Sequence, residues 1–64
     1  MQILKEPPAN SVQFSEPCLT ASESWIIENM AKDLTAAGKR HCVTRTQMKI
    51  KGQMRDVMIL WKVL

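Results

Sequence analysis

The side chains with the greatest potential for nucleophilic or metal chemistry are one histidine, His41, and two cysteines, Cys18 and Cys42. His41 and Cys42 are neighbours in a stretch that alternates like a β-strand. Their side chains therefore point to opposite faces and cannot form a thiolate–imidazole pair. Three potential ligands without a CxxC spacing or a second histidine do not make a zinc site. We expect no metal ion and two free thiols, with Cys42 as a small core residue.

Carboxylates and glycines offer no better basis for catalysis. Glu23 and Glu28 are five positions apart in an expected helix, so they lie on different sides of it and do not form an acid–base pair. The only glycines, Gly38 and Gly52, each fit a local turn, and no glycine-rich phosphate loop is present. We therefore expect no enzyme, no cofactor and no small-molecule substrate.

Charge is unevenly distributed along the chain. Residues 1–35 carry two lysines against five acidic side chains, a net charge of −3, and residues 36–64 carry seven lysines and arginines against one aspartate, a net charge of +6. This asymmetry indicates an anionic partner for the C-terminal half, either nucleic acid or an acidic protein surface. A solvated basic face is the alternative interpretation. The candidate nucleic-acid contacts are Lys39, Arg40, Arg45, Lys49, Lys51 and Lys62.

The elements that position these cations follow from the spacing of apolar residues. From Trp25 to Ala37 apolar residues recur at intervals of three and four, which is typical of an amphipathic helix. Thr20-Ala21-Ser22-Glu23 fits a capping box at its start, and Gly38 fits the left-handed residue at its end. We expect a helix over residues 20–37.

From residue 41 onward the period changes from 3.6 to 2, which predicts a β-hairpin over residues 41–63. A type II′ turn centred on Gly52-Gln53 joins its strands and opposes Met48 to Val57. We expect the helix to cover the hairpin face that carries Met48, Ile50, Val57, Ile59, Trp61 and Val63.

Residues 1–19 contain all three prolines and show no helical pattern, so we expect an extended arm. Two short alternating stretches, residues 2–4 and 11–14, could each add an edge strand. The chain is thus expected to be one α+β domain over residues 1–64. Its single amphipathic helix packs on a small antiparallel sheet that is built from the C-terminal hairpin, with room for an N-terminal edge strand.

This arrangement leaves an apolar patch on the hairpin face away from the helix. An apolar patch with a rim of cations is typical of a contact surface. A chain of 64 residues also has little core of its own, so we expect a homodimer or another protein partner. The residues assigned to this protein-binding or dimer surface are Val43, Met54, Met58, Leu60 and Leu64.

Two functions are consistent with these features. The apolar patch favours a small non-catalytic interaction module, an inhibitor or adaptor that binds a protein or itself through the outer face and edge of the hairpin. The alternative is a small nucleic-acid-binding regulator that uses the basic hairpin, although no helix-turn-helix, ribbon-helix-helix or zinc-finger pattern is present. The sequence lacks a secretory signal and an apolar run of about 20 residues, which predicts a cytoplasmic protein without a membrane partner.

Overall fold

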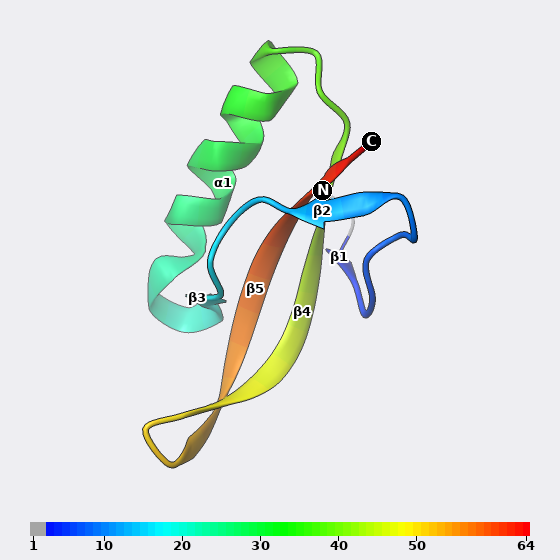
Figure 1. Ribbon diagram of the computed structural model, residues 1–64. Helices are drawn as coiled ribbons and strands as arrows, with labels where there is room; N and C mark the ends of the chain where they lie inside the picture. The colour runs from blue at the N-terminus through cyan, green and yellow to red at the C-terminus, as the bar shows by residue number, and fades with distance from the viewer. Residues whose placement is uncertain (1–2) are drawn as a thin grey trace.

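The computed structural model describes residues 3–64 and shows one helix packed on a mixed five-stranded sheet (Figure 1). The expected α+β class is confirmed, with the C-terminal hairpin and an N-terminal edge strand. The sheet is mixed rather than antiparallel because its first strand lies parallel to the fourth. Residue 2 of the first expected edge strand lies outside the described residues. The elements in chain order are β1 (Ile3–Leu4), β2 (Ser11–Gln13), β3 (Cys18–Leu19), α1 (Thr20–Ala36), β4 (His41–Ile50) and β5 (Gln53–Val63).

Helix α1 begins within one residue of the expected capping box. The N-cap residue is Leu19 rather than Thr20, and the backbone N–H of Leu19 donates to the Glu23 carboxylate at 2.8 Å. The Thr20 hydroxyl oxygen is buried and has no hydrogen-bond partner among the described residues. Of the two hydrogen bonds of a capping box, only the one to the glutamate therefore forms, and its donor is Leu19 rather than Thr20.

Gly38 ends α1 as expected. Its φ of 70° is left-handed, and its N–H donates to the Thr35 carbonyl at 3.0 Å. The N–H of Lys39 donates to the Leu34 carbonyl at 2.9 Å, which completes a Schellman motif. The helix stops at Ala36, one residue before the expected end.

Strands β4 and β5 pair along the whole hairpin. Their turn consists of Lys51 and Gly52, whose φ values of 51° and 82° are typical of type I′. The expected type II′ turn is wrong, as is its register, since Thr46 rather than Met48 lies opposite Val57. A change of two positions in the pairing keeps the same side chains together on each face of the hairpin.

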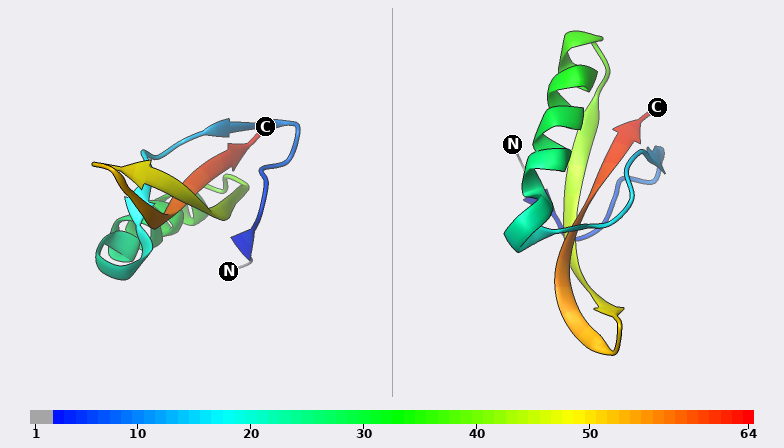
Figure 2. Two further views of the ribbon diagram at one scale, coloured as in Figure 1. Left: turned by 90° about the horizontal axis from the view of Figure 1, so that it is seen from below. Right: turned by 90° about the vertical axis from the view of Figure 1, so that its left-hand side faces the viewer.

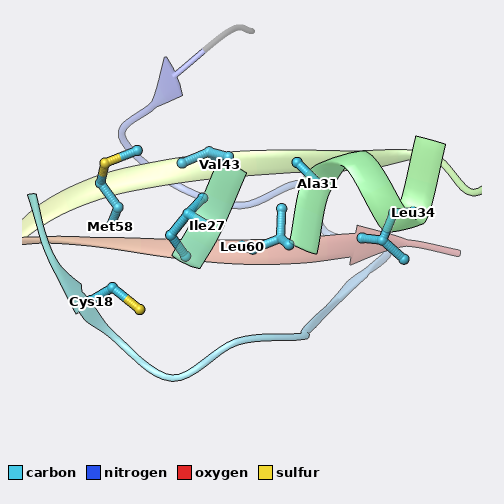
Figure 3. Packing of buried hydrophobic residues seen from close by; sticks show 7 residues of the cluster. All are labelled: Cys18, Ile27, Ala31, Leu34, Val43, Met58 and Leu60. Atoms are coloured by element: carbon cyan, nitrogen blue, oxygen red, sulfur yellow. The ribbon is translucent and has the colours of Figure 1, made fainter. Parts of the chain in front are cut away.

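The helix covers the opposite hairpin face from the one expected. The reason lies in strand β5. Its four consecutive apolar residues, Val57–Leu60, are all buried, as in a strand that is covered on both faces. Alternation then gives no reason to prefer one face for the helix. The core under α1 (Figure 3) consists of Cys18, Ile27, Ala31, Leu34, Val43, Met58 and Leu60.

The N-terminal arm wraps round the hairpin from one edge to the other (Figure 2). Strand β1 pairs with β4, whereas β2 and β3 both pair with β5. Between β2 and β3 the arm leaves the ladder, and the N–H groups of Phe14 and Ser15 both donate to the Leu60 carbonyl. The buried Ser15 Oγ accepts from the Leu60 N–H at 2.9 Å. One serine side chain thus takes the place of a strand partner.

Replacing Ser15 by alanine removes the only hydrogen bond to the buried N–H of Leu60 that the structure shows. We expect Ser15→Ala to lower the free energy of unfolding by about 1–3 kcal/mol, measured by urea denaturation. Ser22→Ala, at an exposed serine in the first turn of α1, serves as the control and should change stability by less than about 0.5 kcal/mol. Equal stability of the two variants would contradict this role of Ser15.

Gly38→Ala tests the left-handed helix end. A Cβ at this position meets no atom within 4 Å, so the cost comes from backbone strain alone. We expect a loss of about 1 kcal/mol in the free energy of unfolding by thermal denaturation. Gly38→Asn should lose less, because asparagine tolerates the left-handed region, and an alanine variant as stable as the parent would refute the assignment.

Candidate functional site

The distal half of the hairpin projects beyond the rest of the molecule as a two-stranded ribbon (Figure 1). Strand β1 pairs with β4 only as far as Thr44, and β3 pairs with β5 only as far as Val57. Residues 45–56, which we call the tip ribbon, therefore have no strand partner on their outer edges in the described structure. All of them are exposed except Ile50, which is half-buried. At its base the ribbon shares shallow hollows with residues 3–5 of the arm and with residues 19–21 at the start of α1. A partner can reach residues 48–54 from both faces and both edges.

Local interactions hold the tip ribbon at both of its ends. At the distal end, the type I′ turn at Lys51-Gly52 matches the right-handed twist of the strands. At the base, the Arg45 guanidinium donates to the Asp56 carboxylate at 3.0 Å, diagonally across the two strands. Because this ion pair is about half exposed, it acts as a local tether rather than a large source of stability. The turn and the ion pair both help to keep the ribbon folded, since an isolated two-stranded hairpin is only marginally stable.

The tip ribbon is strongly basic. It carries four cations against one acid, Asp56, whose charge Arg45 offsets. The hydrogen bond from Arg45 holds the pKa of Asp56 below its ordinary value. Within residues 3–64, no ion pair involves the other three cations, Lys49, Lys51 and Arg55.

The six cations expected to contact nucleic acid do not form one surface. Arg45, Lys49 and Lys51 lie in the tip ribbon. Lys62 lies opposite His41 at the far end of the hairpin ladder and is half-buried. Lys39 and Arg40 belong to the same far end, in the connection from α1 to β4. The structure thus divides the expected site into two basic groups at opposite ends of the hairpin.

Arg55 belongs to the tip ribbon but is not among the cations selected from the sequence. By alternation it shares a face of β5 with Val57, and the helix was expected to cover that face. A signal was available in the element lengths. A 17-residue helix is about 26 Å long, whereas a ten-residue strand is about 33 Å long. A hairpin that is longer than its helix must leave one of its ends uncovered by that helix.

The expected apolar surface is wrong because α1 covers most of it. Val43 and Leu60 are fully buried, and Met58 is nearly so. Met54 and Leu64 are exposed by 61% and 72%, but Met54 lies near the start of β5 and Leu64 follows its last residue. These five residues therefore do not form a contiguous patch.

The thiols and the histidine are not brought together. Cys18 lies in the core under α1, and Cys42 is half-buried on a strand whose neighbouring residue Val43 faces that core. Burial raises the pKa of both thiols, which lowers their reactivity at neutral pH. The Nδ1 atom of His41 lies 3.4 Å from the carbonyl oxygen of Lys39. In residues 3–64, no three histidine, cysteine or acidic side chains are grouped so that they could hold a metal ion.

An open hollow of about 570 Å³ lies between α1 and the start of β4. Its lining includes one acid, Glu28, and one lysine, Lys32, so it presents little net charge. It is lined by Glu28, Ala31, Lys32, Thr35, Ala36 and His41. By comparison, the tip ribbon has a clear excess of positive charge.

Comparisons with protein-family models, with characterised proteins and with solved structures found no match to this chain. Over the part of the chain that the structure describes, α1 is too short and too polar to cross a membrane. The case for the tip ribbon therefore rests on its geometry and charge.

The ion pair at the base of the ribbon predicts a measurable pH effect. The folded-state pKa of Asp56 is lowered, so the pair contributes stability above the unfolded pKa and loses it as pH falls through the folded pKa. We expect the NMR titration midpoint of the Asp56 carboxyl to lie below its ordinary value and to rise in Arg45→Gln. Arg55→Gln is the control and should leave the midpoint lower than in Arg45→Gln. Equal midpoints in the parent and Arg45→Gln would contradict the pairing.

Proposed function

We propose that this protein is a small nucleic-acid-binding regulator that contacts phosphates through the tip ribbon. The observation that carries the proposal is the exposed tip ribbon, whose distal part projects beyond the helix (Figure 1) and which carries four cations and one acid that Arg45 neutralises. Lysine and arginine side chains on such a segment bind phosphate and release condensed counterions, so binding falls as salt rises. A cytoplasmic setting is part of the proposal and fits the two free thiols.

The composition of the tip ribbon favours a duplex over a single strand. Residues 45–56 contain no aromatic side chain on which an unpaired base could stack. Contact with a phosphate backbone needs only cations at suitable spacing. We therefore assign double-stranded nucleic acid as the preferred partner.

The second candidate is the protein-interaction module, and one observation favours it. The outer edge of β4 has no strand partner over residues 45–50 within the described structure, and such an edge can accept an extended segment from another protein. The cations on that edge would select an acidic segment and disfavour a second copy of this basic strand. Edge pairing gives no role to the cations of β5, so we rank this candidate second.

Charge reversal in the tip ribbon separates the proposed function from a general effect of net charge. We expect Lys49→Glu with Lys51→Glu to weaken binding to a labelled 20-base-pair DNA duplex by about 100-fold at about 50 mM salt, measured by fluorescence anisotropy. The matched control is Lys32→Glu with Lys39→Glu, which makes the same change in net charge outside the ribbon. It should retain binding to within about threefold.

Three results would overturn the proposal. They are no binding by the parent protein, equal losses in the two double variants, and full affinity in the tip-ribbon variant. Light scattering at low and high salt shows whether the protein self-associates through β4, which the like charges on that edge disfavour in the parent protein.

A further inference from the structure

Each face of the tip ribbon carries one cationic side chain opposite one methionine. Lys49 lies opposite Met54 on the helix side of the hairpin, and the next pair, Met48 opposite Arg55, lies on the other side. Both methionines are exposed, by 61% for Met54 and 36% for Met48. Each face therefore presents one cation beside one exposed thioether, at adjacent positions of the ladder.

The third cation without an ion pair lies at the end of the ribbon. Lys51 is the first turn residue and has a φ of 51°, and Gly52 follows it without a side chain. The remaining cation, Arg45, is held by Asp56 at the base of the ribbon. The three cations without such a partner thus lie on one face, on the opposite face and at the tip.

Cations on both faces and at the tip suit a groove with anionic groups along both sides better than a flat anionic surface. A flat surface can contact only one face of the ribbon, which would leave either Lys49 or Arg55 unused. The major groove of B-form DNA is about 12 Å wide and about 8.5 Å deep, and a row of phosphates lines each rim. A single β-layer with its side chains is about 10 Å thick, so it fits that width.

The heights of the cations above the turn agree with the depth of the groove. Lys49 belongs to the second residue pair from the turn and Arg55 to the third. At about 3.4 Å per residue, these pairs lie about 7 and 10 Å above the turn. With the turn at the floor of a groove about 8.5 Å deep, both side chains are level with the phosphate rims.

We propose that the tip ribbon enters the major groove of B-form DNA with its turn leading. Lys49 contacts the phosphates of one strand and Arg55 those of the other, while Lys51 reaches base edges at the floor. The A-form major groove of an RNA duplex is too deep and narrow for such entry. This inference rests on the proposed function and adds its substrate class and its binding geometry.

The experiment compares single neutral variants on the two faces. We expect Lys49→Gln and Arg55→Gln each to weaken binding to a 20-base-pair DNA duplex by about tenfold at about 50 mM salt, to within threefold of one another. Each should also reduce the slope of log affinity against log salt by about 1. Lys32→Gln is the control and should change neither quantity. An RNA duplex of the same sequence and a single DNA strand should bind the parent protein at least about tenfold more weakly.

The inference and the proposed function fail in different ways. A loss in only one of the two face variants would show that the ribbon lies flat on the duplex, and equal affinity for the RNA duplex or the single strand would exclude groove entry. Either result overturns this inference and leaves nucleic-acid binding in place. If the parent protein binds none of the three nucleic acids, both proposals are wrong. Circular dichroism of each variant checks that these exposed substitutions leave the fold unchanged.

Discussion

The rest of the structure depends on the long antiparallel ladder between β4 and β5. It provides the surface on which α1 packs and both edges along which the N-terminal arm pairs. On the two edges, strands β1 and β3 pair with this ladder only as far as Thr44 and Val57. Residues 3–64 form no further helix or strand that covers the remainder. The exposed tip ribbon is thus a direct result of a hairpin that is longer than the elements packed on it.

Much of the fold could be predicted from local patterns. The apolar spacing from residue 25 to 37 predicted the helix, Gly38 predicted its end, and the change of period at residue 41 predicted the hairpin. These signals are local, because a helix stripe, a left-handed glycine and strand alternation each depend on neighbouring residues. The edge strands were harder to predict, since β1 and β3 contain only two residues each and owe their conformation to pairing with the hairpin.

What the sequence could not decide was how the elements pack. Both faces of β5 are apolar from Val57 to Leu60, so alternation did not show which face the helix covers. The turn was misplaced because glycine was taken as its first residue. In the structure the first turn residue is Lys51, in a left-handed conformation that residues other than glycine rarely adopt. The wrong face for the helix also led to the wrong candidate site. Val43, Met58 and Leu60, expected at the surface, are in the core, and Arg55 was expected beneath the helix.

We propose above all that the tip ribbon is the surface that binds nucleic acid. Backbone amide NMR during titration with a short DNA duplex tests it most directly. We expect chemical-shift changes concentrated in residues 45–56, with small changes at the opposite end around Lys39, Arg40 and Lys62. Changes centred on that opposite end or on the hollow beside α1, or the absence of any change, would contradict it.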